Sequence, residues 1–275
     1  MKACRLIPVL LLVLISSLLI GCAEVPLTQR KSLNILPQSQ MLSLSLQQYD
    51  TVLKKSKLSQ DTTKVRMVQR VGKRIAAAAE AFLLVSGQGG QARQYQWEFN
   101  LIEDDKAANA WCMPGGKVAV YTGILPFTQD ENGLAVVIGH EVAHAIANHG
   151  NERMSQSLLA SMGGMALSVA LAEKPTATRE LFMTAFGVGT NVGLLLPYSR
   201  LHESEADRIG LTLMARAGYD PRGAVSLWER MNRSGGKRPH EFLSTHPAPD
   251  SRITNIKRYI SEALPHYDKA IKKRP

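Results

Sequence analysis

Apolar residues recur at helical spacing in two segments near the start of the chain, residues 41–55 and 62–84. Their apolar positions fall three or four apart on one side, as in amphipathic helices that pack on a core. Asp61 or Thr62 is placed to cap the second helix. We interpret the two segments as scaffold helices packed behind the functional part of the domain.

The pattern changes to alternation over residues 95–102, which predicts a strand with one buried face. Two short apolar runs follow, residues 109–113 and 117–121, separated by Pro114-Gly115-Gly116. Proline followed by glycines between apolar runs is typical of a hairpin turn. These segments predict a small antiparallel sheet.

Helical patterns dominate the remainder of the chain, and we expect helices at residues 130–148, 200–217, 221–231 and 250–264. Two apolar stretches, residues 158–172 and 181–196, fall short of the roughly 18 unbroken apolar residues that a membrane span needs. We interpret both as core helices or as a mobile apolar cover over a cleft, with an interfacial role at a membrane as the further alternative. The predicted fold class is α+β, a mostly helical domain with a small antiparallel β-sheet beside the helix at 130–148.

Composition supports a folded globular protein, because 45% of the 275 residues are hydrophobic and 20% are charged. This length suits one sizeable domain, which we place at residues 41–275. The formal net charge of +10 is scattered, without a basic stripe interleaved with aromatic residues. That pattern argues against nucleic acid as a partner. It favours a solvated basic surface, with attraction to an anionic membrane as the second reading.

The first 21 residues resemble a targeting segment rather than part of the fold. Lys2 and Arg5 precede an apolar run over residues 6–20, which is typical of a secretory signal peptide. The run ends in Leu-Ile-Gly-Cys, which resembles a bacterial lipobox and predicts lipidation of Cys22. The alternatives are an uncleaved anchor or an ordinary cleaved signal.

Ala23 follows Cys22 in place of the aspartate that retains lipoproteins in the inner membrane. We therefore expect a membrane-anchored outer-membrane lipoprotein that faces the periplasm. Residues 22–40 contain Pro26 and Pro37 among polar residues and are predicted to be a tether from the lipid to the domain. Cys112 is then the one cysteine left in the domain, so we expect no intramolecular disulfide.

Residues 140–144 read His-Glu-Val-Ala-His within the predicted helix 130–148. Residues four apart share a helix face, so His140 and His144 can point at one metal ion. Glu141 lies beside that face, where its carboxylate can accept a proton from a water at the metal. Two histidines with a glutamate base are the arrangement of zinc peptidases. The alternative reading is a helix with two surface histidines.

A catalytic zinc usually takes a third protein ligand. One common solution places a glycine three residues and a histidine six residues after the second histidine, but Ala147 and Gly150 stand there. His149 is one residue off, opposite His140 on a continuous helix, and we interpret it as a surface or capping histidine.

A carboxylate from a later helix is the other solution. Glu203 and Asp207 share a helix face, so one can bind the metal while the other orients a ligand histidine. Glu205 lies about 200° from Glu203 and should point elsewhere.

The His-Glu-Val-Ala-His motif followed by Glu203-x-x-Ala206-Asp207 resembles the gluzincin metallopeptidases of the CAAX-prenyl-protease and HtpX-like family. The resemblance is closest to their soluble periplasmic lipoprotein and mitochondrial stress-peptidase branches. It covers residues 109–253 and includes Pro114-Gly115-Gly116-Lys117 and Ser244-Thr245-His246-Pro247. It implies a zincin fold with one Zn²⁺ per chain, held by the ligands His140, His144 and Glu203, with Asp207 supporting them.

The resemblance also implies catalytic roles for Glu141, as general base, and for His246. We expect His246 to stabilise the oxyanion, or to take the fourth zinc position and keep the enzyme latent. An ordinary loop histidine is the third reading. Substrate is expected to lie extended along an edge strand and to add to it by backbone pairing. That strand is predicted to comprise Lys117, Val118, Ala119, Val120 and Tyr121.

The predicted function is a zinc-dependent endopeptidase of the bacterial envelope that hydrolyses unfolded or misassembled envelope proteins. The outer-membrane assembly machinery is a further expected partner. The alternative is a zinc-stabilised periplasmic chaperone or assembly factor whose peptidase is latent. Glu141 favours the enzyme, because a structural zinc needs no base and usually has four protein ligands.

Overall fold

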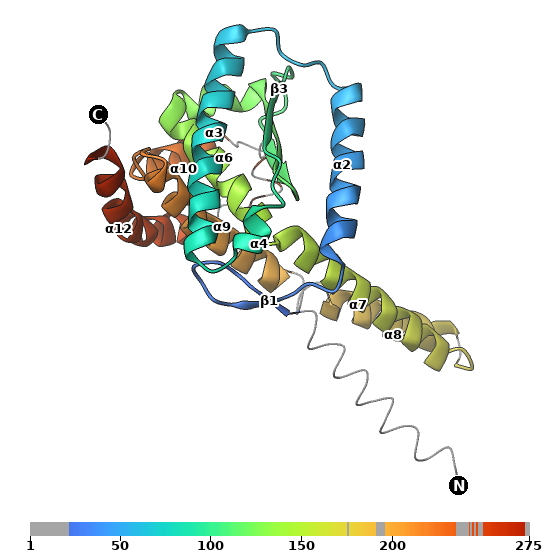
Figure 1. Ribbon diagram of the computed structural model, residues 1–275. Helices are drawn as coiled ribbons and strands as arrows, with labels where there is room; N and C mark the ends of the chain where they lie inside the picture. Colours follow the sequence, from blue (N-terminus) through green and yellow to red (C-terminus); the bar gives the residue numbers. More distant parts are fainter. Residues whose placement is uncertain are drawn as a thin grey trace.

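The computed structural model describes residues 22–174, 176–190, 196–234, 242, 244, 246 and 250–272. Helices account for most of this part of the chain, and the predicted α+β class is confirmed (Figure 1). The longer helices are α2 (Gln38–Lys55), α3 (Thr62–Val85), α6 (Glu131–Ile146), α7 (His149–Ala170), α8 (Thr176–Thr190), α9 (Leu196–Arg216), α10 (Gly223–Ser234) and α12 (Asp250–Lys272). The short ones are α4 (Gly89–Ala92), η2 (Thr122–Ile124) and α5 (Leu125–Thr128). The strands are β1 (Cys22–Glu24), β2 (Lys31–Leu33), β3 (Glu98–Ile102), β4 (Ala110–Met113) and β5 (Lys117–Tyr121).

The three-stranded sheet has the order β3-β5-β4, with β3 parallel and β4 antiparallel to β5. The hairpin between β4 and β5 is present as predicted. Gly115 and Gly116 form its turn with φ values of 84° and 85°, a region that favours glycine. The prediction of a wholly antiparallel sheet is wrong. The chain leaves β3, skips one strand position to form β4, and then folds back so that β5 fills the gap.

Residues Lys117 to Tyr121 therefore form the central strand, and their prediction as an edge strand is wrong. Strand β5 pairs with a neighbour on each side, so its backbone groups are already used in the sheet. The edge beside the motif helix is β4, which packs against α6. The hairpin pattern in the sequence could not show which of its two strands would face outward.

Helices α2 and α3 pack on opposite faces of this sheet, as alternate residues of β3 show. The Phe99 ring lies against α3 at Gly72, whereas Asn100 donates a 2.8 Å hydrogen bond to the Tyr49 hydroxyl of α2. Asp61 caps α3, as predicted, by accepting hydrogen bonds from two backbone amides. Helix α3 also packs against α6 and α9, so it is part of the core rather than a peripheral scaffold.

Helix α6 runs through the centre of the domain. It begins after Asp130, whose carboxylate accepts a 2.8 Å hydrogen bond from the Gly133 amide. Every residue from 133 to 146 is buried. Gly139 meets Gly210 of α9, and a Cβ built on Gly139 would lie 2.9 Å from the Gly210 carbonyl oxygen. The two backbones therefore touch one residue before the first motif histidine.

Residues 22–36, here named the N-terminal strap, pack on the body of the domain. Strands β1 and β2 pair antiparallel from Cys22 to Leu33, and Val25 and Ser32 are each only 1% exposed. Over residues 22–36, the segment predicted to be a tether is therefore packed on the domain rather than extended into solvent. The polar composition suggested solvation, but one face of this segment is buried against the domain.

Helices α7 and α8 lie side by side and extend away from the rest of the fold (Figure 1). Several of their large apolar side chains are exposed, among them Met165 at 63%, Val169 at 77% and Leu181 at 69%. The interpretation of these stretches as core helices or as a cover over the cleft is wrong for their described parts, and residues 191–195 lie outside the described residues. None of the described helices combines the length and the apolar character needed to cross a membrane.

We predict that Gly210→Ala lowers the free energy of unfolding by about 1–3 kcal/mol, because its Cβ would lie 2.8 Å from the His140 amide nitrogen. Chemical denaturation measures this loss. Gly150→Ala in α7 is the control, since its Cβ would meet nothing within 4 Å. Alanine should there gain up to about 1 kcal/mol of helix propensity. Equal stability of the two variants would show that the α6–α9 contact is not tight.

Candidate metal centre

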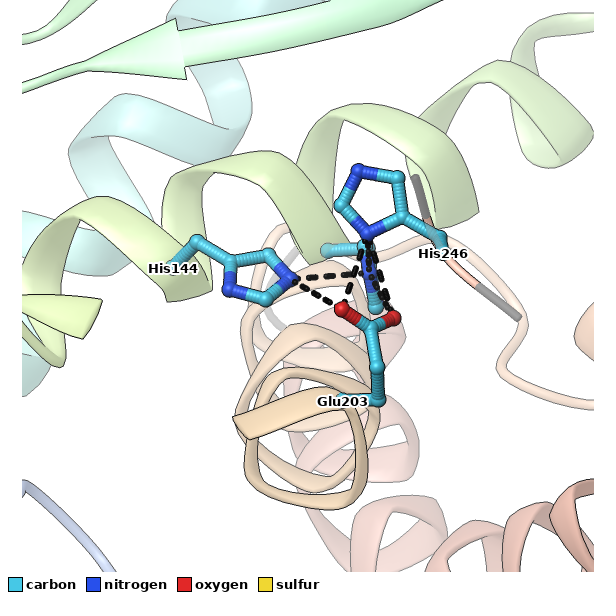
Figure 2. Close-up of side chains that lie close together, drawn as sticks. His144, Glu203 and His246 are labelled. Carbon is cyan, nitrogen blue, oxygen red and sulfur yellow. Dashed lines mark hydrogen bonds and ion pairs between the residues drawn. The ribbon is translucent and has the colours of Figure 1, made fainter. Parts of the chain in front are cut away.

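Four side chains from three parts of the chain converge on one point. Figure 2 shows three of them, His144, Glu203 and His246, pointing toward one another. His140 and His144 come from adjacent turns of α6, Glu203 comes from α9, and His246 lies between α10 and α12. One nitrogen or oxygen of each lies within 4.8 Å of those of the others, and all four residues are buried. The structure thus brings together the three residues that the resemblance implies as ligands, and it places His246 with them, as the prediction of a fourth zinc position for His246 requires.

The spacing of these atoms suits a zinc ion. Tetrahedral zinc with ligands near 2.0–2.1 Å separates them by about 3.3 Å from one another. Here Nε2 of His140 lies 3.1 Å from Nε2 of His144 and 3.3 Å from Nδ1 of His246. The Glu203 carboxylate lies 3.3 Å from each α6 histidine and 3.0 Å from Nδ1 of His246. Both the donor types and their separations fit Zn²⁺.

Glu141 borders this site without joining it. Its side chain is buried, and its Oε1 has no hydrogen-bond partner among the described residues. Nε2 of His246 lies 3.5 Å from this oxygen. Burial raises the pKa of the Glu141 carboxyl above its usual range. A buried carboxylate oxygen left free next to a metal site is placed to exchange a proton there.

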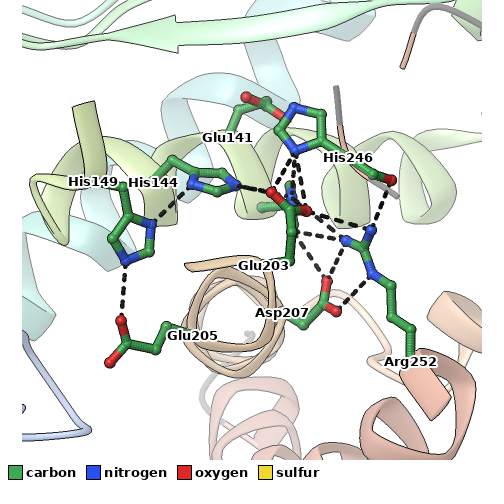
Figure 3. Close-up of polar contacts among 9 residues, drawn as sticks. Glu141, His144, His149, Glu203, Glu205, Asp207, His246 and Arg252 are labelled. Atoms are coloured by element: carbon green, nitrogen blue, oxygen red, sulfur yellow. Dashed lines mark hydrogen bonds and ion pairs between the residues drawn. The ribbon is translucent and has the colours of Figure 1, made fainter. Parts of the chain in front are cut away.

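His140 is held from behind by Asp207, as the four-residue spacing from Glu203 predicted. Oδ1 of Asp207 lies 3.0 Å from Nδ1 of His140. Arg252 donates 2.8 Å hydrogen bonds to both oxygens of the same carboxylate (Figure 3). The guanidinium of Arg252 also stacks 3.6 Å above the Trp228 ring. Burial alone would raise the pKa of Asp207, but the charge of Arg252 and the contact with His140 together outweigh burial, so the pKa is lowered and the carboxylate stays ionised.

His144 is held by a different partner, His149. The interpretation of His149 from the sequence, as a surface or capping histidine, is wrong. His149 is fully buried, and its Nδ1 lies 2.9 Å from Nδ1 of His144 (Figure 3). The extrapolation failed because α6 ends at Ile146 and Asn148 turns the chain with a φ of 56°. Glu205, which points away from the metal as expected, lies 3.2 Å from Nε2 of His149.

His246 is fixed from both sides of its segment. Its amide donates a 2.8 Å hydrogen bond to the Phe242 carbonyl, and the Phe242 amide donates in turn to the carbonyl of Ala108, just before β4. Arg252 donates a 3.1 Å hydrogen bond to the His246 carbonyl. The segment that carries His246 is therefore linked both to the sheet edge and to the group that holds Asp207. Thr245 and Pro247 lie outside the described residues.

A helix with two histidines and a glutamate, completed by a carboxylate from a second helix, defines the class of zinc metallopeptidases. Comparison with known families agrees with this class. The sequence pattern of Peptidase family M48 matches residues 63–260, and the chain belongs to this family.

Curated relatives occur in mitochondria and in bacteria. The chain is 41% identical over 198 residues to the mitochondrial metalloendopeptidase OMA1 of Schizosaccharomyces pombe, covering 71% of this chain and 53% of that one. It is 30% identical over 245 residues to the human OMA1 metalloendopeptidase, covering 87% and 46%. It is 29% identical over 174 residues to the beta-barrel assembly-enhancing protease of Escherichia coli, covering 62% and 35%. The chain thus spans about half the length of these two OMA1 relatives and about a third of the bacterial one.

We predict that Asp207→Asn weakens zinc binding roughly 10- to 100-fold, the usual effect of losing a group that supports a ligand histidine. Asparagine can still accept a hydrogen bond, but it lacks the charge that pairs with Arg252. Competition with a chelator measures the dissociation constant. Asp50→Asn, at an exposed position of α2, serves as control. Unchanged zinc affinity in a folded Asp207→Asn protein would remove Asp207 from the metal centre.

Proposed function

We propose that this protein is a zinc-dependent endopeptidase whose ligands are His140, His144 and Glu203, with Glu141 as general base. The observation that carries the proposal is the buried, unpartnered Oε1 of Glu141 beside a ligand set with zinc spacing. A structural zinc site would need no such carboxylate, and leaving one buried without a partner costs stability.

The chain's own residues divide the chemistry of peptide hydrolysis among them. Zinc bound at this site would acidify a water molecule and polarise the scissile carbonyl. Glu141 accepts the proton of the attacking water and then delivers it to the amine nitrogen as the C–N bond breaks. Asp207 and His149 keep the rings of His140 and His144 oriented throughout.

His246 holds the site closed in this arrangement. Its Nδ1 lies among the three ligands, where the fourth zinc position is expected, and its Nε2 faces Glu141. That position is the one a water must take for catalysis. The geometry therefore favours the latent reading of His246 over the oxyanion reading, and activity requires the segment that carries His246 to move.

We further propose that substrate pairs with β4 rather than with β5. An extended peptide can add only to an edge strand, because a central strand has no free backbone groups. Strand β4 is such an edge and packs against the motif helix. Backbone pairing of this kind selects peptides by their extended conformation more than by their side chains, which suits unfolded substrates.

For the cellular role we propose quality control of unfolded or misassembled envelope proteins by an outer-membrane lipoprotein facing the periplasm. The lipobox-like segment ending at Cys22 supports the location. The Escherichia coli relative, whose name describes enhancement of beta-barrel assembly, supports a link to outer-membrane assembly. These two observations support the proposal that the chain belongs to the periplasmic lipoprotein branch of the family.

The closed position of His246 also favours a second candidate function, that of a zinc-stabilised chaperone or assembly factor whose peptidase stays latent. The two functions differ in whether cells need Glu141. Rescue of envelope assembly by a variant without its base would support the chaperone.

We predict that Glu141→Gln lowers the cleavage of an unfolded protein such as casein by at least about 10²-fold, because the amide cannot accept the water's proton. Zinc content, measured by elemental analysis, should stay at one per chain, since Glu141 is not a ligand. Glu98→Gln, at an exposed position of β3, controls for loss of a carboxylate. Undiminished cleavage by zinc-loaded Glu141→Gln would refute the proposed function.

We predict that His246→Ala raises basal cleavage several-fold and weakens zinc binding, because it opens the fourth position and removes one ligand. Rates per bound zinc, at saturating zinc, separate the two effects. An oxyanion role predicts the opposite, a loss of about 10²–10³ in kcat. A fall in kcat with unchanged zinc affinity would therefore reject the gating role.

A further inference from the structure

A second buried polar cluster lies next to the metal centre, where α7, α9 and the N-terminal strap meet. Glu152 and Glu205 are 1% and 4% exposed, and His149 and His202 stack on each other with ring centroids 4.3 Å apart. His202 lies 2.9 Å from Glu152, as His149 lies beside Glu205. Two buried carboxylates placed this close to one another need a cation between them.

Arg30 of the strap supplies that cation. Its guanidinium donates to both oxygens of Glu152, each at 2.7 Å, and to both oxygens of Glu205, at 3.0 and 2.8 Å. Thr28 adds a 2.7 Å hydrogen bond from its hydroxyl to Glu205. An arginine fork can bridge two carboxylates in this way, whereas a lysine ammonium is a single point charge. Glu205 is thus fixed by two side chains of the strap.

The strap itself is attached to the domain beyond this cluster. The Ile35 amide donates a 2.9 Å hydrogen bond to the Ser155 hydroxyl, and the Leu36 carbonyl accepts one from Asn151 at 2.8 Å. Val25 is buried in the core cluster. These contacts fix the positions of Thr28 and Arg30 relative to Glu205.

Glu205 leads back to the metal centre through a chain of donors and acceptors. If Nε2 of His144 is to face a metal, its ring proton must sit on Nδ1, which then donates to Nδ1 of His149. His149 must in turn carry its proton on Nε2, which donates to Glu205. Each step has one donor and one acceptor, and the chain ends on the carboxylate that Arg30 and Thr28 hold.

We propose that the N-terminal strap is a positioning element of the metal centre, acting on His144 through Arg30, Glu205 and His149. His140 and His144 are then held by two separate supports, one from Arg252 of α12 and one from the strap. The inference builds on the proposed zinc ligands. It concerns zinc retention, so it can be tested in a protein whose peptidase is silent.

The experiment measures the rate of zinc release from the full-length chain in detergent into a chromogenic chelator. Arg30→Met alone would leave two buried carboxylates without the cation that compensates their charge, so the main variant is the charge-balanced Arg30→Met/Glu152→Gln. Lys57→Met/Glu103→Gln is its matched control, because it removes an equal number of charges from an exposed ion pair. Thr28→Val is a milder variant that removes one hydrogen bond to Glu205 and no charge.

We expect zinc release to accelerate roughly tenfold in Arg30→Met/Glu152→Gln and about threefold in Thr28→Val, near the lower end of the effect of losing a ligand's support. His149→Phe should accelerate it at least as much. Adding it to the strap variants should give no further acceleration, because residues that act through one path are not additive. A purely structural role of the strap would instead predict additive effects.

Two results would overturn the proposal. One is a release rate in folded Arg30→Met/Glu152→Gln equal to that of the Lys57→Met/Glu103→Gln control. The other is full additivity with His149→Phe. Failure of the proposed function gives a different result, because a wild-type chain that binds no zinc, or that binds it without cleaving peptides, is recognised before any variant is compared.

Discussion

The close contact between α6 and α9 at Gly139 and Gly210 is the constraint on which the site depends. Glycine at both positions lets the two backbones touch, with the Gly210 segment packed against the His140 amide. Glu203, Asp207 and Gly210 lie four and three residues apart and so share one face of α9. The same approach that packs the helices therefore delivers one carboxylate to the metal position and another to the back of His140.

The buried charges around the site are arranged as two supports that differ in chemistry. His140 rests on Asp207, which Arg252 neutralises directly. His144 contacts neutral His149, which in turn contacts Glu205. Arg30 compensates the negative charge of Glu205. Both supports end on an arginine from an element outside the α6–α9 pair. The metal centre thus depends on the packing of the two ends of the described chain, the strap and α12.

Closure of the site comes from a separate segment. His246 contacts Glu203 and His140. Its segment is linked through Phe242 to Ala108, two residues before β4, and through Arg252 to α12. An extended substrate on β4 would lie next to the same segment. Under the proposed function, occupation of the sheet edge and displacement of His246 are therefore physically connected.

Local patterns in the sequence determined a large part of the fold and of the site. Helical periodicity placed most helices, and local residue types placed the Asp61 cap and the Pro-Gly-Gly hairpin. All of these depend on residues close together in the chain. The four-residue spacing placed His140 with His144 and Glu203 with Asp207, because a single turn of helix sets those distances.

Tertiary structure decided what local periodicity cannot encode. The position of β5 at the centre of the sheet depends on a crossover, and the burial of His149 depends on one left-handed residue, Asn148, that redirects the chain. From its sequence the strap is indistinguishable from a polar tether. In the fold, Arg30 of the strap pairs with Glu152 and Glu205, which lie 122 and 175 residues further along the chain. Long-range pairing of buried charges has no signature in neighbouring residues, so only the folded chain shows which arginine belongs to which glutamate.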